Sequence, residues 1–167
     1  MTAFHIAAIP PTELDGIRAT GRDVAGNEFR PFADGTGSSP LRCCLRLSRK
    51  GERVALIAYA PPGTAGAYAE TGPVFVHAEA CEGYPAGGGW PPEFRDRQQV
   101  LRAYDARGRI ADAILIDAAD ADERRLADPA QVLAPELGIA KLLADPAHVV
   151  VHSRNVLYGC YMFAVSR

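Results

Sequence analysis

The chain has 167 residues and a formal net charge of -2, with 48% hydrophobic and 23% charged residues. This length suits one domain over residues 1–167, since a single core usually holds about 100–200 residues. The composition excludes wholesale disorder, and the near-neutral charge gives no basic patch for nucleic acid or an anionic membrane. No apolar run reaches the roughly 18 residues that cross a bilayer, and Met1 to Pro11 does not resemble a secretory signal. We therefore expect a cytoplasmic protein.

The four cysteines are Cys43, Cys44, Cys81 and Cys160. They contain no CxxC pair, and adjacent residues of a strand point to opposite faces, so Cys43 and Cys44 are not expected to act together. Disulfides are rare in a reducing cytosol, and we therefore expect free thiols.

The first part of the chain predicts a short strand over Phe4–Ile9 and a helix over Glu13–Ala19 with Thr12 as its N-cap. Residues 20–40 are rich in Gly, Asp, Ser and Pro and predict a long loop. From Leu41 to Leu47 the apolar residues alternate, which is typical of a strand that buries one face.

A turn at Lys50–Glu52 and a second strand over Arg53–Tyr59 would complete a hairpin with Leu41–Leu47. A third strand, Pro73–Glu79, is almost continuously apolar apart from His77. It is followed by the Gly- and Pro-rich loop 83–92, which contains the only tryptophan, Trp90.

The later part of the chain predicts two more hairpins around a helical region. Gln99–Tyr104 and Arg109–Ile116 flank a turn in which Gly108 can adopt positive φ. Asp120 to Asp145 is the main helical region, with Leu137, Leu142 and Leu143 on its apolar stripe. The closing hairpin pairs His148–Arg154 with Tyr158–Val165.

These elements predict an α+β fold: a mostly antiparallel sheet of about eight short strands with hairpin connections. An N-terminal helix and one or two helices before the C-terminal hairpin complete it.

Polar residues repeat at i, i+2 spacing on three predicted strands, in the sets Arg42/Cys44/Arg46, His77/Glu79 and His152/Arg154. Polar groups on apolar strands are costly to bury without partners, so these faces could meet in one cationic, thiol-containing pocket. The alternative is the solvated face of an ordinary antiparallel sheet.

A three-residue turn at Asn155–Leu157 would place His152 opposite Cys160, with Cβ atoms about 4.5–5.5 Å apart. An imidazole there could lower the pKa of the thiol and make it nucleophilic. A turn of even length would instead leave Cys160 as a small buried apolar residue.

His77, Cys81, His152 and Cys160 could together offer two nitrogen and two sulfur ligands to zinc. They lack the short paired spacing of zinc fingers and ribbons, so we predict no metal site and no cofactor. Nucleotide-binding, P-loop, zincin and hydrolase motifs are also missing from the sequence.

The segment Tyr68-Ala-Glu-Thr-Gly-Pro-Val-Phe-Val-His77, with Cys81 and Tyr84 after it, resembles a bacterial domain-of-unknown-function family, number 1203. Val151–Asn155 with Gly159-Cys160 is similar to the closing motif of that family, and Arg42-x-Cys44-Leu45 to its opening one. The resemblance implies no assigned activity. It adds Glu70 to the polar residues that the i, i+2 spacing on the predicted strands selects.

We therefore expect a small protein that binds a small anionic molecule, either as a ligand or as a substrate. Arg42, Glu70 and Arg154 are the candidate ligand-binding residues, and His77, His152, Cys160 and Cys44 the candidate catalytic residues. The alternatives are a non-catalytic interaction module that uses Trp90 and the loops 20–40 and 83–92, and a zinc-stabilised structural domain.

Overall fold

The computed structural model describes residues 4–116 and 134–167. Its strands form two sheets of five strands each. In spatial order, the C-terminal sheet contains β1 (His5–Ala7), β10 (Tyr161–Ser166), β9 (His148–Asn155), β7 (Gln99–Asp105) and β8 (Ile110–Ile116). The N-terminal sheet contains β2 (Phe32–Ala33), β5 (Arg53–Tyr59), β6 (Gly72–His77), β3 (Pro40–Leu41) and β4 (Arg46–Leu47).

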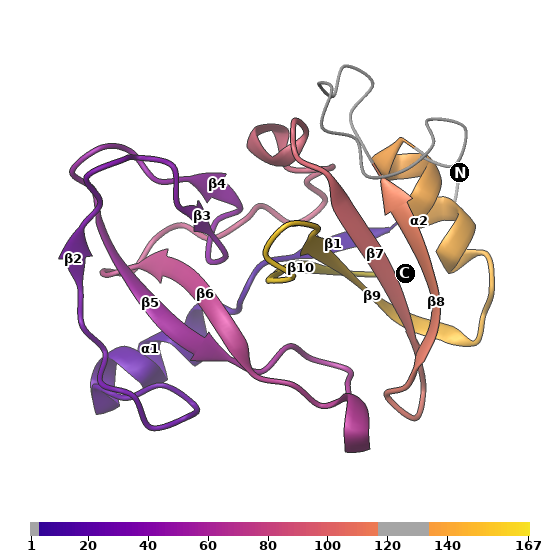
Figure 1. The fold of residues 1–167 in the computed structure, drawn as a ribbon, viewed down its shortest axis with the longest axis horizontal. Helices are drawn as coiled ribbons and strands as arrows, with labels where there is room; N and C mark the ends of the chain where they lie inside the picture. The colour runs from indigo at the N-terminus through magenta and orange to yellow at the C-terminus, as the bar shows by residue number, and fades with distance from the viewer. Residues whose placement is uncertain (1–3, 117–133) are drawn as a thin grey trace.

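The two sheets lie side by side along the long axis of the molecule (Figure 1). Helix α1 (Pro11–Thr20) lies with the N-terminal sheet, and helix α2 (Pro135–Leu143) covers the C-terminal sheet. The α+β class is confirmed, whereas the prediction of one sheet is wrong. Neither helix in the described ranges has the length and apolar character that crossing a bilayer requires.

Strand β10 connects two groups of core side chains. Phe163 belongs to the core that contains Leu101 of β7 and Ile139 and Leu142 of α2. Tyr161 belongs to the core that contains residues of the N-terminal sheet and α1. The pairing of β10 with β9 shifts register between Tyr161 and Phe163, which is the signature of a β-bulge. The irregularity lets one short strand supply both cores.

Two predicted hairpins are confirmed, and one is wrong. Strands β7 and β8 pair antiparallel, with Gly108 at φ 74°, and β9 pairs antiparallel with β10. Strand β5, however, pairs with β2 and β6, so it forms no hairpin with Leu41–Leu47. The sheets are antiparallel except where β3 runs parallel to β6.

The predicted strand Leu41–Leu47 is interrupted by a turn. Leu45 has φ 55° and donates its N–H to Leu41 O at 2.9 Å, so the chain reverses and β4 pairs back on β3. The prediction that Arg42, Cys44 and Arg46 share one strand face is therefore wrong, because side chains alternate with a period of two only in an extended chain.

Other element boundaries also differ from the prediction. Helix α1 begins at Pro11 with Pro10 at the N-cap position, so Thr12 is inside the helix and caps nothing. Residues 20–40 include β2, and β6 ends at His77, leaving Glu79 beyond the strand. In the predicted helical region 120–145, residues 120–133 lie outside the described residues.

The apolar stripe of α2 is partly as predicted. Leu142 and Leu143 are buried, whereas Leu137 is 58% exposed. Trp90 is buried and packs against Phe163 in a T-shaped arrangement, with ring centroids 4.9 Å apart. This burial removes Trp90 from the surface on which the interaction-module alternative relied.

Candidate functional site

A cavity of about 510 Å³ opens between the two sheets, which is within the usual range for small-molecule sites. Its apolar lining comes from Leu56 and Phe75 of the N-terminal sheet and from Met162 of the C-terminal sheet. The remaining lining residues are Ser38, Ser39, Pro40, Arg42, Pro73, Arg97, Asn155, Tyr158 and Cys160.

Arg42 is the buried cation of this cavity, with only 3% of its surface exposed. Its Nε donates to Tyr161 O at 2.8 Å, and its Nη1 donates to Pro40 O, so the guanidinium joins strands of both sheets. Burial lowers the pKa of Arg42 to about 10, which still leaves it charged at neutral pH. Within the described ranges, no carboxylate pairs with it.

Arg97 lines the same cavity and repels the charge of Arg42. It lies in the loop that leads into β7. No Asp or Glu within residues 4–116 and 134–167 forms an ion pair with it. The sequence analysis missed Arg97 because this residue lies outside the i, i+2 patterns of the predicted strands and outside any motif. Only the tertiary fold brings this loop to the turn that follows β3.

A second cavity of about 130 Å³ adjoins the first and shares Pro73, Tyr158 and Cys160 with it. Here Arg154, 4% exposed, forms an ion pair with Glu70, and its Nη1 donates to Gly159 O at 3.2 Å. Arg154 Nε is buried with no partner in the described residues. The charge of Arg154 is thus compensated, unlike that of Arg42.

Cys160 lies where the two cavities meet, and its Sγ is 3.5 Å from Tyr158 O. Its predicted pairing with His152 is wrong: His152 faces Ala164, and Arg154 faces Tyr161. The turn is longer than three residues, since Asn155 N–H donates to Cys160 O at 2.9 Å and Gly159 has φ 69°.

His152 is fully buried between two tyrosine rings, with centroids 4.5 Å from that of Tyr104 and 5.2 Å from that of Tyr161. Its Nε2 is 2.7 Å from Pro62 O and donates to it, since a carbonyl can only accept. Burial lowers the pKa of His152 to about 4. It is a neutral side chain at neutral pH.

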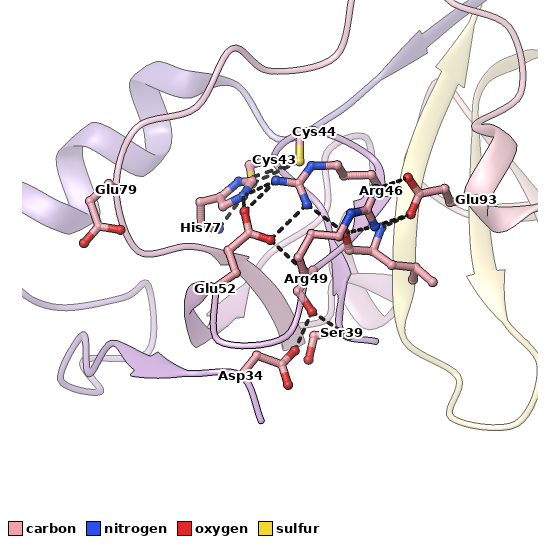
Figure 2. A network of polar contacts seen from close by, with 12 residues as sticks. Asp34, Ser39, Cys43, Cys44, Arg46, Arg49, Glu52, His77, Glu79 and Glu93 are labelled. Atoms are coloured by element: carbon pink, nitrogen blue, oxygen red, sulfur yellow. Dashed lines mark hydrogen bonds and ion pairs between the residues drawn. The ribbon is translucent and has the colours of Figure 1, made fainter. Parts of the chain in front are cut away.

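His77 lies in a separate group with Cys43, Cys44 and Cys81, at the exit of β6. Figure 2 shows its ring beside Cys43 and Cys44. Its Nδ1 is 3.3 Å from Cys43 Sγ and 3.7 Å from Cys44 Sγ. Both cysteines reach the imidazole because they occupy a turn and not a strand. The contact with Cys43, together with that to Glu52, raises the pKa of His77 to about 9 despite burial.

On the other side of the imidazole, Nε2 is 2.7 Å from Glu52 Oε1. Glu52 accepts two hydrogen bonds from Arg46, at 2.6 and 2.9 Å, which lower the pKa of that carboxyl to about 2. A second pair, Arg49 with Glu93, continues the network of Figure 2 toward the C-terminal sheet. Glu52 is thus a fixed carboxylate aimed at His77.

The predicted single pocket of Arg42, His77, His152 and Arg154 is divided in the structure. Arg42 lines the larger cavity and Arg154 the smaller one, with Cys160 common to both. His77 and Cys44 line another depression, on the N-terminal sheet. The cause is the division of the strands between two sheets, which no residue pattern within a strand reveals.

Comparison with known proteins gives a family but no activity. No curated protein and no solved structure matches the chain. The family described as Protein of unknown function (DUF1203) matches residues 38–167, which include all four cysteines and both cavity arginines. The chain therefore belongs to this family, as the motifs around His77 and Cys160 predict.

Proposed function

We propose that the protein binds a small organic anion in the larger cavity between its sheets, through Arg42 and Arg97. The observation that carries the proposal is the buried guanidinium of Arg42, which borders a ligand-sized cavity without a described carboxylate partner. A buried charge without a counter-charge is costly, and a bound anion would remove that cost.

The shape of a guanidinium favours carboxylate or phosphate as the anionic group. Arg presents planar donors that fit two oxygens at once, and two of the Arg42 nitrogens already hold the side chain in place through carbonyls. Ser38, Ser39 and Asn155 add neutral polar groups to the lining.

The apolar part of the lining favours a ligand with a hydrocarbon body. Leu56, Phe75 and Met162 lie on the cavity wall together with Tyr158. Burying each CH₂ group of a ligand there contributes about 0.8 kcal/mol. The ligand class is thus an acyl or aromatic carboxylate, or a phosphate monoester with a similar body.

Isothermal titration with octanoate, octyl phosphate and the neutral amide octanamide tests this proposal. A hydrogen bond to a charged group contributes about 1.5–3 kcal/mol, so at least one anion should bind about tenfold or more tightly than octanamide. The better of the two anions identifies the head group.

Arg97→Ala is the informative variant, because Arg42 also joins the two sheets and its loss would disturb the fold. Arg107→Ala is the matched control, since Arg107 is an exposed arginine on the β7–β8 turn. We expect Arg97→Ala to weaken the binding of the anion and Arg107→Ala to leave it unchanged. Equal binding of octanoate, octyl phosphate and octanamide, or equal losses in both variants, would refute the proposal.

A further inference from the structure

Four soft or borderline donor atoms meet at the exit of β6, outside the anion cavity. They are the Sγ atoms of Cys43, Cys44 and Cys81 and a ring nitrogen of His77, all within 4.8 Å of one another. Three thiols and one imidazole are one of the ligand sets of structural zinc sites.

The spacing of these atoms is close to that of a tetrahedral zinc site. Zn–S and Zn–N bonds of about 2.3 and 2.0 Å imply edges of roughly 3.5–3.8 Å between ligand atoms. The corresponding distances here are 3.3 and 3.7 Å from His77 Nδ1 to the sulfurs of Cys43 and Cys44, and 4.0 Å between those sulfurs. An ion would need shifts of only a few tenths of an ångström among these three atoms.

The surroundings of His77 also match a metal ligand. Metal-bound histidines usually donate their other ring N–H to a carboxylate, which fixes the tautomer. Glu52 Oε1 lies 2.7 Å from His77 Nε2 and is itself held by Arg46, so Glu52 keeps the proton on Nε2, and a zinc ion that displaces the other ring proton would bind Nδ1, which faces the thiols. Arg46 Nη2 is also 2.9 Å from Nε2, but both then act as donors and Glu52 accepts from each.

The backbone around the four residues is fixed by contacts of its own. The turn at Leu41–Leu45 presents two neighbouring thiols on one side, which a strand cannot do. Arg18 donates to the carbonyls of His77, Ala78 and Glu79 at 3.0–3.1 Å and holds the bend that returns the chain to Cys81. The arrangement therefore does not depend on the side chains alone.

We propose that Cys43, Cys44, His77 and Cys81 bind one zinc ion. Four protein ligands leave no open position, so the ion acts as a structural link between the turn after β3 and the end of β6. In this set, Cys43 and Cys44 take the places that His152 and Cys160 have in the zinc set considered from the sequence. The proposal is independent of anion binding, because the cluster and the cavity share no residue.

The test is a metal analysis of the full chain, expressed with added zinc and purified without chelator. We expect about one zinc ion per chain, and, after its exchange for Co²⁺, the thiolate-to-metal charge-transfer absorption of a tetrahedral sulfur site. With zinc bound, a thiol reagent should modify Cys160 alone, and removal of the metal should make the partly exposed thiols of Cys44 and Cys81 reactive as well.

Cys81→Ser and Cys160→Ser form a matched pair of variants. Cys81 is partly exposed on a loop, so its replacement keeps the core intact, and Cys160 is another partly exposed thiol, outside the cluster. We expect Cys81→Ser to lose zinc at equilibrium with a competing chelator and Cys160→Ser to retain it.

Glu52→Gln and Glu93→Gln separate the role of the carboxylate behind His77 from a general loss of charge. Both residues pair with an arginine of the same network, but only Glu52 touches His77. Glu52→Gln should lower the affinity for zinc about 10–100-fold, and Glu93→Gln should leave that affinity unchanged. Absence of zinc and of cobalt–thiolate absorption in the folded wild type, or equal zinc loss in Cys81→Ser and Cys160→Ser, would overturn the proposal.

Discussion

At the scale of the residue, His152 illustrates how burial decides what a side chain can do. Its ring is enclosed by Tyr104 and Tyr161, and its Nε2–H donates to Pro62 O. A proton added to this imidazole would be a charge that is closed off from solvent and has no carboxylate partner among residues 4–116 and 134–167. His152 therefore acts as a packing residue that holds the β9 surface against the Pro62 turn.

His152 makes folding stability depend on pH. Its pKa is about 4 in the folded protein and about 6.5 in the unfolded chain, so between these values the unfolded state binds more protons. Its contribution is fully present above about pH 6.5 and decreases as the pH falls, with a slope approaching about 1.4 kcal/mol per pH unit.

Urea denaturation of wild type and His152→Phe at pH 7 and pH 5 measures this dependence. We expect the variant to be less stable at pH 7 by about 1–3 kcal/mol, because the Pro62 carbonyl loses its donor. The difference should shrink at pH 5. A constant difference between the two pH values would show that His152 does not titrate in this way.

Cys43 and Cys44 show where inference from single residues ends. Period-two logic assigns adjacent residues to opposite faces, and this logic fails once Leu45 adopts φ 55° and the chain turns. Leucine rarely adopts this conformation, so nothing in the sequence Leu41–Leu47 indicates a turn. The sequence analysis includes His77 and Cys81 in one candidate zinc set. Their proximity to Cys43 and Cys44 depends on that turn.

At the scale of the element, the two α-helices offer opposite tests of helix packing. A Cβ added at Gly16 in α1 would have no atom within 4 Å, whereas one added at Gly138 in α2 would lie 2.9 Å from Ile116 Cγ2 and 3.2 Å from Leu101 Cδ1. The first glycine has space for a side chain, and the second permits close contact with β7 and β8.

Gly16→Ala should therefore stabilise the protein by about 0.5–1 kcal/mol, the usual gain in helix propensity. Gly138→Ala gains the same propensity but meets overpacking that typically costs about 1–3 kcal/mol, so we expect net destabilisation. Thermal unfolding of the two variants gives the signs. Stabilisation by Gly138→Ala would mean that α2 has room for a side chain against β7 and β8.

The elements also show what local sequence predicts well. The β7–β8 hairpin was predictable because two β-prone runs flank a short turn that contains Gly108. The pairing of β5 with β6 was not, since 12 residues from Ala60 to Thr71 separate them and tertiary contacts decide the partner. Short connections predict partners, and long ones do not.

At the scale of the whole molecule, β10 makes the two cores depend on each other. Phe163 packs in one core and Tyr161 in the other, on a single strand of six residues. A change in one core is therefore transmitted through the backbone of β10 to the other. The division into two sheets does not imply two independent folding units.

Unfolding followed by Trp90 fluorescence and by far-UV circular dichroism tests this dependence. Trp90 contacts Phe163 and reports on the C-terminal sheet, whereas dichroism reports on both sheets. The two transitions should coincide in wild type and in Phe163→Ala, which should lose about 3–5 kcal/mol. Separate transitions would instead indicate that the sheets unfold independently.

The cavity between the sheets is likewise a property of the whole fold, since Arg42 and Cys160 reach it from distant parts of the chain. Both residues belong to patterns that the sequence shows. Arg97 does not, because the residues of its loop show no strand-like alternation. Their meeting is the basis of the proposed anion binding, and Cys160 provides a chemical probe inside the site.

The most direct test is therefore the rate at which iodoacetamide alkylates Cys160, followed by mass spectrometry with and without saturating octanoate or octyl phosphate. An anion bound beside Arg42 and Arg97 covers the thiol, so we predict that at least one of the two anions slows the alkylation of Cys160, and that octanamide at the same concentration protects less. Unchanged alkylation of Cys160 at concentrations where an anion is bound would contradict the assignment of this cavity as the binding site.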